Sequence, residues 1–525
     1  MKICLSKLPW HNSDNVWVTG FIRTGNKYLT KDELLKFFSG IDTIFKFEQT
    51  LKTANGQFSV IIKTSDEIWA ATDRLRNYPL FYTRLNDDFI ISDDCYKLTE
   101  ELSEKCFNPG AVDCFLSTGY VINNLTLIND VFQIEAGEYI RAGDCLSREF
   151  YYDIACAPVV EKDFETRANE LNNIISVVFK YHFQALSHKF IAIPLSGGFD
   201  SRLVASMCAK YHPENVLCYT YGIKNNLEVA PAKEVAKRLG FKWINIVYNS
   251  DLIDEFLSDD FFSDYYPFAS NLSSMFFMQE YFVVKHLKEN KLVPDNCVFV
   301  NGFSGDMLAG SYLTPAMKNQ IDKNKIADLI LKEKFVLIKL SRQKRSNTLK
   351  LICDKIPDGI SDAWKVFENW EYKEWQAKFI VNSAKIFTFF GYDYVLPLFD
   401  NLFLDFFSNL QFQFKLDKKL YDYVLTEYIF KDLNLNLSNE INPLPTQKTF
   451  QRVKEKFKPF VPYKIKNLFI QRQSPVFYDE ITKVMLEELG SNIINPRQSN
   501  YYNSYIIQWY LLKTKQLFKM RDFED

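Results

Sequence analysis

The stretch Phe190-Ile-Ala-Ile-Pro-Leu-Ser-Gly-Gly-Phe-Asp-Ser-Arg202 is the most informative part of this 525-residue chain. An apolar run typical of a buried strand ends at a pair of glycines, and a helical pattern begins at Asp200. A strand–turn–helix junction directs backbone N–H groups and the positive end of the helix dipole at one point, which favours phosphate binding. The glycines allow close backbone approach, the hydroxyls of Ser196 and Ser201 add donors, and Asp200 is placed to hold magnesium. No G-x-x-x-x-G-K-[ST] motif is present, so the site is not the usual P-loop.

The residues after this loop predict a doubly wound parallel sheet. β-rich runs at 215–221 and 243–248 enclose a helix at 228–239, which ends at Gly240 as a C-terminal glycine should. Strands and helices that alternate at this spacing are typical of a parallel sheet. Ligands of such sheets bind beyond the carboxyl ends of the strands. Pro194 removes one ladder donor from the first strand, near its end, where the loss is best tolerated.

A second acidic position follows about a hundred residues later. The run 297–301 is a predicted fourth strand, and Gly302-Phe-Ser-Gly-Asp306 comes directly after it. An aspartate after a glycine-rich turn is commonly only a helix N-cap. At the end of a strand of the same sheet, however, Asp306 could join Asp200 as a carboxylate pair that holds magnesium beside bound phosphates.

Several motifs resemble known families. The S-G-G-x-D-S loop resembles that of ATP pyrophosphatases, which split ATP into AMP and pyrophosphate. Gly302 to Tyr312 and Gly391 to Asp400 resemble the G-E-G-A-D-E-L-F-G-G-Y and G-L-E-V-R-V-P-F-L-D motifs of asparagine synthetase homologues, which include β-lactam synthetase and lasso-peptide cyclases. This resemblance implies an adenine-nucleotide α-hydrolase-like (PP-loop) fold with added helices, and ATP and Mg²⁺ as cofactors. It also implies a set of ATP-binding residues: Leu195, Ser196, Gly197, Gly198, Asp200, Ser201, Thr220 and Gly302.

The N-terminal part is similar to class II glutamine amidotransferases, which have an Ntn-type αββα sandwich. Asn55-Gly-Gln-Phe58 and the run 73–82 resemble their L-N-G-x-F-A and R-D-x-x-G-x-K-P-L-Y-Y segments, and the resemblance implies that Asn55 and Gly56 are the counterparts of oxyanion-hole residues. Such a glutaminase uses a cysteine at position 2, whose freed α-amino group acts as the base. Position 2 here is Lys2, and Cys4 would need further trimming. We therefore expect a catalytically silent scaffold.

The synthetase part also departs from the family pattern. Phe303 and Val395 replace a glutamate and an arginine, and Asp393 replaces a longer glutamate. The resemblance implies that Asp393 contributes acid–base chemistry on the acceptor side. It also implies that Lys448, in a loop similar to R-P-K-x-G-F, stabilises the pentacoordinate phosphorus, although an ordinary exposed lysine is the alternative. The residues expected to bind ATP thus match the family pattern, whereas those expected on the acceptor side differ from it.

Composition favours a soluble globular enzyme. The 63 basic and 65 acidic residues give no reason to invoke nucleic acid or anionic membranes, and no apolar run is long enough to span a bilayer. The ten cysteines form no C-x-x-C pair, and the N-terminus carries no export signal, so we expect free thiols and a cytoplasmic location.

Three domains are expected, at 1–157, 160–450 and 451–525, the last a helical extension. The predicted function is an ATP-dependent, AMP-forming amide ligase that adenylates a small-molecule or peptide carboxylate. The nitrogen would come from ammonia, from a separate glutaminase, or from an amine on the substrate itself, as in β-lactam or lasso-peptide formation. A non-catalytic ATP-binding regulator is the remaining alternative.

Overall fold

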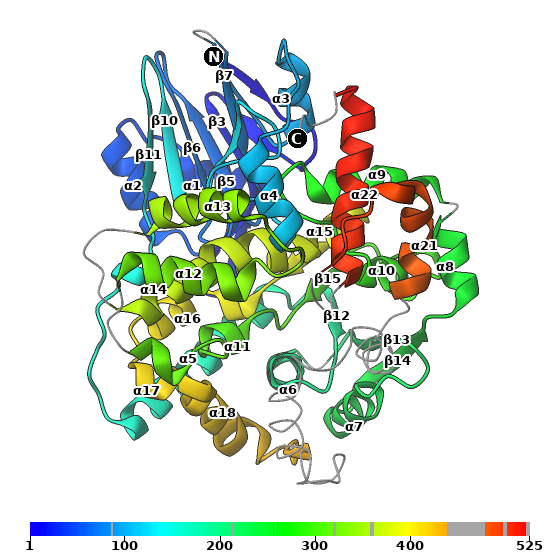
Figure 1. Cartoon of the computed structure of the whole chain (residues 1–525). Coiled ribbons are helices and arrows are strands. Elements are labelled where there is room, and N and C mark those ends of the chain that lie inside the picture. Colours follow the sequence, from blue (N-terminus) through cyan, green and yellow to red (C-terminus); the bar gives the residue numbers. More distant parts are fainter. Residues whose placement is uncertain are drawn as a thin grey trace.

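The computed structural model describes residues 1–85, 88–212, 214–257, 259–318, 322–356, 362–437, 478–496 and 501–520. Two stacked sheets form the N-terminal half, and a parallel sheet surrounded by helices forms the remainder (Figure 1). The seven-stranded sheet has the order β11-β10-β6-β5-β3-β2, with β4 paired to β3, and all its pairings are antiparallel. Its strands are β2 (His11–Ser13), β3 (Val16–Thr24), β4 (Lys27–Thr30), β5 (Gly56–Lys63), β6 (Ile68–Thr72), β10 (Glu138–Ala142) and β11 (Leu146–Phe150).

A four-stranded sheet packs on one face of this larger sheet. It has the order β1-β8-β7-β9 and consists of β1 (Lys2–Cys4), β7 (Phe81–Leu85), β8 (Asp88–Ser92) and β9 (Val131–Gln133). Successive side chains of β5 point to opposite faces of the sheet, so they pack in different layers. Phe58, Val60 and Ile62 pack with α1 (Lys31–Phe38) and α2 (Ile44–Thr53), whereas Ile61 faces the smaller sheet.

Two further helices cover the outer face of the smaller sheet. Phe81 and Ile90 of that sheet share a core with α3 (Cys95–Glu101) and α4 (Pro109–Thr118). The layers therefore run helix, sheet, sheet, helix, which confirms the predicted αββα sandwich.

The second half contains a five-stranded sheet in which every pairing is parallel. Its order is β14-β13-β12-β15-β16, from β12 (Phe190–Pro194), β13 (Val216–Gly222), β14 (Lys242–Val247), β15 (Cys297–Val300) and β16 (Asp393–Val395). Helix α5 (Phe164–Ala185) precedes β12, and α6 (Phe199–Tyr211) and α7 (Val229–Leu239) connect β12 to β13 and β13 to β14. The predicted doubly wound sheet is confirmed, and Pro194 indeed forms the last pair of its strand, with Tyr219.

The chain order reverses at the centre of this sheet. From β12 the strands proceed outward to β13 and β14, and then β15 returns to the other side of β12. Ile191 is aligned with Val298, so two segments about a hundred residues apart become neighbours. Open α/β sheets bind ligands at such a reversal, beyond the carboxyl ends of the strands.

Many helices surround this sheet (Figure 1), and none among the described residues has the length and apolar character needed to cross a membrane. The longer ones are α8 (Ser250–Leu257), α9 (Asp260–Ser270), α10 (Gln279–Glu289), α12 (Lys323–Lys334), α13 (Arg342–Lys355), α14 (Ala363–Trp370), α16 (Asn401–Ser408), α21 (Tyr478–Leu489) and α22 (Tyr501–Phe518). Shorter α-helices are α11 (Gly305–Leu308), α15 (Lys385–Phe389), α17 (Phe412–Lys415) and α18 (Lys419–Val424), and η3 (Glu371–Ile380) and η7 (Leu425–Phe430) are π-helical. Short 3-10 segments are η1 (Ile154–Cys156), η2 (Pro315–Lys318), η4 (Val381–Ala384), η5 (Pro397–Phe399), η6 (Leu416–Lys418) and η10 (Gly490–Asn492).

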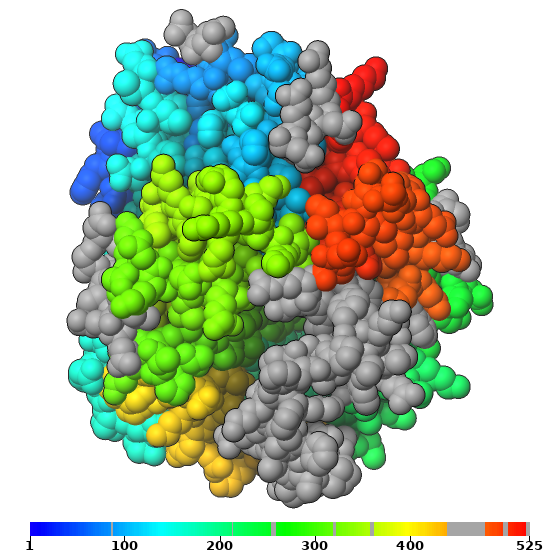
Figure 2. Space-filling model, in the orientation of Figure 1, coloured from blue at the N-terminus to red at the C-terminus, as the bar shows by residue number. Residues whose placement is uncertain are grey.

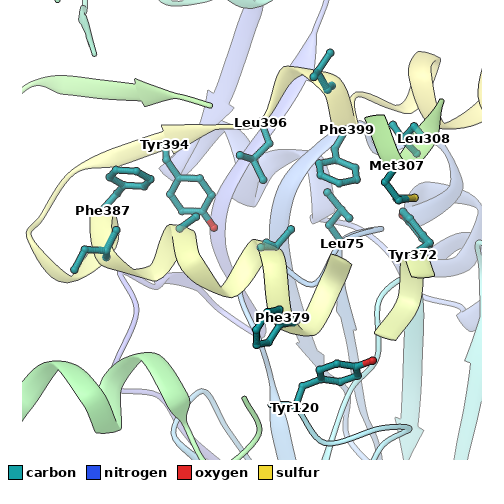
Figure 3. Close-up of a cluster of buried hydrophobic side chains, with 14 of the residues drawn as sticks. Leu75, Tyr120, Met307, Leu308, Tyr372, Phe379, Phe387, Tyr394, Leu396 and Phe399 are labelled. Carbon is teal, nitrogen blue, oxygen red and sulfur yellow. The ribbon is translucent and has the colours of Figure 1, made fainter. Parts of the chain in front are cut away.

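One hydrophobic core crosses between the halves. Leu75 and Tyr120 from the N-terminal half lie in the same buried cluster as Tyr372 and Phe379 of η3, as Figure 3 shows, and the rings of Tyr120 and Phe379 are 6.0 Å apart. The C-terminal helix α22 joins this core through Tyr510, and Figure 2 shows the C-terminal helices against the N-terminal half. The predicted boundaries at 157 and 450 therefore remain interpretations of the sequence.

Candidate nucleotide-binding site

The predicted phosphate loop and the predicted second acidic loop lie against each other. The first follows β12 and the second follows its neighbour β15. A Cβ atom on Gly302 would lie only 2.7 Å from the backbone carbon of Asp200, and one on Gly305 would lie 2.8 Å from its Oδ1 atom. Only glycine permits this contact, which explains both glycines of the second loop.

Hydrogen bonds within the first loop fix its shape. The hydroxyls of Ser196 and Ser201 are 2.9 Å apart, and the Gly198 N–H donates to Ser196 Oγ at 3.2 Å. The loop leads into the N-terminus of α6, whose first N–H groups have no carbonyl partner within the helix. Leu195 and Thr220 join the loop to the next strand, because the Thr220 hydroxyl donates to the Leu195 carbonyl at 2.7 Å. The structure thus gathers the predicted nucleotide residues at one edge of the sheet.

The two predicted metal-binding aspartates meet at the same place. The backbone N–H of Asp306 donates to Asp200 Oδ2 at 3.0 Å, and the Tyr421 hydroxyl donates to Asp200 Oδ1 at 2.8 Å. Both aspartates are half-buried. Burial, and then the neighbouring Asp306 charge, raise the pKa of Asp200 from 3.8 to about 6.

This carboxylate pair has the chemistry that magnesium requires. Two carboxylates that repel each other in a partly dry site are stabilised by a divalent cation. Among the residues described, no group of three potential His, Cys, Asp or Glu ligands is found. Magnesium commonly binds through one or two carboxylates and completes its shell with phosphate and water oxygens. Asp200 and Asp306 therefore fit the ion as ligands beside a bound nucleotide.

Sequence reasoning missed the residues that support these loops. Ser304 adopts a left-handed conformation, with φ of 65°, and its hydroxyl donates to the side chain of Gln376 on η3. Tyr421 holds Asp200, and the Lys418 charge lowers the Asp200 pKa in part. Gln376 lies on the π-helical segment η3, and such segments recur at functional sites. A π-helix cannot be predicted from the sequence pattern, so this support for the loop was not foreseen.

A buried amide also lies at the end of β15. Asn301 is 1 % exposed, and neither its Nδ2 nor its Oδ1 atom has a hydrogen-bond partner among the described residues. Its backbone N–H donates to the Val395 carbonyl at 3.1 Å, which joins β15 to β16. The unpaired amide beside Gly302 is a group that a ligand could satisfy.

The structure places one of the two predicted catalytic residues, Asp393, away from this site. Asp393 is the first residue of β16, so it lies at the amino ends of the strands, whereas Gly302 lies beyond the carboxyl end of β15. Its side chain is exposed and its nearest cationic partner is Lys189, at 3.8 Å. Lys448 lies outside the described residues. Phe303 is half-buried against the core, and Val395 is buried.

The N-terminal residues that resemble an oxyanion hole contact the synthetase half instead. The Asn55 amide donates to Asp400 Oδ1 at 3.1 Å and accepts from the Asn401 N–H at 3.1 Å. Asp400 Oδ2 also lies 2.6 Å from Arg23 Nη2 and 3.2 Å from His182 Nε2. Burial alone would raise the pKa of Asp400, but His182 and Arg23 outweigh it and hold that pKa well below its usual range.

The N-terminal resemblance implies a nucleophilic cysteine at position 2, and this chain has Lys2 there. It begins β1, and its ammonium group pairs with Glu101. Cys4 is the last residue of β1, and its carbonyl accepts a hydrogen bond from the Ser92 hydroxyl. Position 2 therefore presents a paired ammonium group and no thiol.

Comparison with known proteins supports the resemblance in the second half. Residues 184–434 match the family model described as asparagine synthase. The chain is 24 % identical over 271 residues to asparagine synthetase [glutamine-hydrolyzing] 1 of Bacillus subtilis (strain 168), and 23 % identical over 273 residues to a probable asparagine synthetase of Acanthamoeba polyphaga mimivirus. These matches cover 50 % and 51 % of this chain, and 41 % and 47 % of the relatives. The chain is thus similar to asparagine synthetases over about half of its length, and the matches span under half the length of these two relatives.

Two solved structures show weak overall similarity. They are an NH3-dependent NAD synthetase from Campylobacter jejuni and an NMN synthetase from Francisella tularensis, with 19 % and 16 % identity and TM-scores of 0.19 and 0.20. The matches cover 29 % and 43 % of this chain and 62 % and 93 % of those chains.

Proposed function

We propose that this chain, which is similar to asparagine synthetases, is an ATP-dependent, AMP-forming amide ligase. One observation supports this above all: the loop after β12 and the loop after β15 meet so closely that Asp306 donates its N–H to Asp200. A phosphate-binding helix N-terminus and a magnesium-binding carboxylate pair would then serve one nucleotide. The family match to residues 184–434 supports ATP-dependent amidation or ligase chemistry at the level of the family.

The chain's own groups would act chiefly by electrostatics. The N–H groups at the start of α6 and the hydroxyls of Ser196 and Ser201 would bind the departing pyrophosphate. Asp200 and Asp306 would hold magnesium, which neutralises charge that develops on the phosphates. Lys418, whose charge already acts on Asp200, would add a cation beside them, and Lys448 is proposed to act near the α-phosphate. A substrate carboxylate would attack the α-phosphorus, and a nitrogen nucleophile would then displace AMP.

The nitrogen source distinguishes two versions of this reaction. Lys2 supplies no thiol, and Asn55, the counterpart of an oxyanion-hole residue, is bound to Asp400 and Asn401. These observations favour a nitrogen that is not released by the N-terminal half. An amine on the substrate itself, as in lactam or lasso-type closure, meets that condition, as do free ammonia and a separate glutaminase.

A non-catalytic ATP-binding regulator is the second candidate function. Phe303 and Val395 favour it, because an apolar side chain cannot supply the acid–base or ionic contacts of the glutamate and arginine that the family has there. In that case the protein would bind Mg²⁺ and ATP without pyrophosphate release. The carboxylate pair fits both candidates, and the family match to residues 184–434 favours the enzyme.

Isotope exchange between pyrophosphate and ATP, measured with a panel of carboxylates, tests the proposal. We expect exchange that depends on one class of carboxylate and on magnesium, and that Asp200→Asn abolishes. Asp260→Asn is a matched control, because Asp260 also lies in the first turn of a helix but far along the chain from the loops. ATP binding without exchange for any carboxylate would favour the regulator.

A further inference from the structure

A pocket separate from the nucleotide site lies where α12 meets α13, two helices that lie side by side (Figure 1). Its volume is about 450 Å³, which is within the range typical of binding pockets. The described residues that line it are Leu331, Phe335, Lys339, Leu340 and Arg345. None of them belongs to either nucleotide loop, so this pocket needs an explanation of its own.

The floor of the pocket is apolar and is fixed by the fold. Leu331 and Phe335 belong to the central core, with exposed fractions of 3 % and 2 %, and Leu340 packs against that core. The connection between the two helices is tied to α4, because the Leu337 N–H donates to the Ser117 carbonyl at 3.0 Å. A ligand would therefore meet a preformed surface, which lowers the entropy cost of binding.

The rim of the pocket carries an excess of positive charge. Between 331 and 345 the chain has six basic residues and one acidic residue, Glu333. Three of the basic residues are ion-paired: Lys334 with Glu371, Lys344 with Asp113 and Arg345 with Asp328. Three others are exposed and form no ion pair within the part of the chain that the structure describes: Lys332, Lys339 and Arg342.

The surroundings of Arg345 leave it able to pair with a ligand. The side chains of Arg345 and Asp328 are 44 % and 55 % exposed, and a surface ion pair of this kind contributes little, so it can exchange for another. Arg342, Lys344 and Arg345 stand in the first turn of α13, where no acidic residue occurs, at the positive end of the helix dipole. A negatively charged ligand would therefore be favoured at this rim over a neutral or cationic one.

The combination of an apolar floor and a cationic rim distinguishes between the possible ligands. Nucleic acid is bound mainly through its phosphates, which need no apolar recess. A membrane surface is bound by apolar side chains that protrude into it, whereas Leu331 and Phe335 are recessed. Protein interfaces commonly place one apolar anchor in a pocket and charged pairs around it.

We propose that this pocket docks an acidic segment of a partner protein. The segment inserts one large apolar side chain against Leu331, Phe335 and Leu340 and places its carboxylates beside Lys339 and Arg345. This docking does not depend on the reaction at the nucleotide site.

Fluorescence anisotropy of the full chain tests the site with a short labelled peptide, rich in aspartate and glutamate, that carries one central leucine. A second peptide has serine in place of the leucine. We expect the leucine peptide to bind about tenfold or more tightly than the serine peptide, because burial of a leucine side chain is worth at least that factor. Equal affinity for the two peptides, or no binding of either, would overturn the proposal.

Two variants of the pocket separate its charge from its apolar floor. Lys339→Glu should weaken binding of the leucine peptide about tenfold or more, because it sets a like charge against the peptide. Leu340→Asn should remove most of the preference for leucine over serine and leave the salt-dependent part of the binding. If Leu340→Asn does not fold, Lys339→Glu, which changes an exposed side chain, still tests the site.

Lys180→Glu is the matched control. Lys180 is also exposed, lies on α5 outside the pocket lining, and makes the same change in net charge. At physiological ionic strength its affinity for the leucine peptide should stay within about twofold of the wild type, because distant charges are screened. A loss as large as that of Lys339→Glu would show that the peptide senses only overall charge, which would contradict the site.

The same assay includes the two other kinds of ligand. Labelled single-stranded DNA and phosphatidylserine vesicles should bind to the wild type no more tightly than the serine peptide does. If either binds more tightly than the leucine peptide and loses its affinity in Lys339→Glu, the surface recognises nucleic acid or membrane and the proposal is wrong.

Discussion

Two aspartates, Asp200 and Asp400, follow strands of the same sheet and have opposite surroundings. Asp400 is held by Arg23, His182 and Asn55, and its pKa lies well below the usual range. Asp200 faces another carboxylate, Asp306, and its pKa is raised to about 6. Asp400 is stabilised by its neighbours in the folded chain, whereas under the proposed function Asp200 becomes favourable only when a cation binds. The proposal therefore distinguishes a residue that maintains the structure from one that is kept at a cost for function.

The largest expected effect is on catalysis, at the nucleotide site. Asp306→Asn should lower pyrophosphate exchange about a thousandfold or more, because a lost magnesium ligand removes about 4 kcal/mol of charge stabilisation from the transition state. Its unfolding midpoint should not fall. Near wild-type exchange in this variant would show that Asp306 is not a metal ligand.

The next largest effect is on stability, at the interface. Asp400→Asn should lower the free energy of unfolding by about 3 kcal/mol, because Arg23 is left buried with its charge unpaired. The asparagine can still accept the Leu402 N–H at the start of α16, so the loss reports charge and not helix capping. Affinity for Mg²⁺ and ATP, measured by calorimetry on the folded protein, should stay within about twofold. A large loss of affinity would remove the distinction between the two aspartates.

The pH dependence should be opposite in sign at the two positions. The folded-state pKa of Asp200 lies above its unfolded value, so its contribution to stability falls as pH rises from about 4 to about 6. The folded-state pKa of Asp400 is depressed, so its contribution is present above about pH 4 and is lost in acid. Magnesium must displace the Asp200 proton, and its affinity should therefore fall up to tenfold per pH unit below about 6. An Asp200→Asn variant with the same pH profile would refute the assignment.

The smallest effect is expected at the support of the second loop. Ser304→Gly relieves the positive φ but loses the hydroxyl donated to Gln376, so the free energy of unfolding should change by less than about 1 kcal/mol. Turnover should fall about tenfold with little change in the KM for ATP, because the loop that carries Asp306 is less well fixed. A large change in stability would mean that the loop is structural only.

The sequence was sufficient to predict the strands and the phosphate loop, because each depends on local pattern. An apolar run, two glycines and a helix start predict β12, its loop and α6 without tertiary information. The contact between Asp200 and Asp306 could be inferred because parallel strands bring their carboxyl ends to one edge. Gly302 and Gly305 were visible as glycines, but the reasons for them required the structure: the backbone of Asp200 lies against Gly302, and the side chains of Tyr421, Leu398 and Asp200 lie against Gly305.

Other parts of the site could not be predicted in this way. Tyr421 and Gln376 reach the loops from helices that carry no motif, and only tertiary packing brings them there. Asp393 matched a motif by its position in the sequence, yet the direction of β16 places it at the amino ends of the strands, away from the two loops. The role of Asn55 as a partner of Asp400 depends on how the halves meet, which a pattern within either half does not specify.

The most direct test of this account is the free energy of unfolding of the wild type and Asp200→Asn at pH 8, with and without Mg²⁺ and ATP. Without ligand, we expect Asp200→Asn to be more stable by on the order of 1–2 kcal/mol, since a half-buried, repelled charge has been removed. With Mg²⁺ and ATP, the wild type should gain stability, the variant should gain little, and the order should reverse. A variant that is less stable without ligand, or that gains as much from Mg²⁺ and ATP as the wild type, would contradict the claim that Asp200 is kept for the nucleotide.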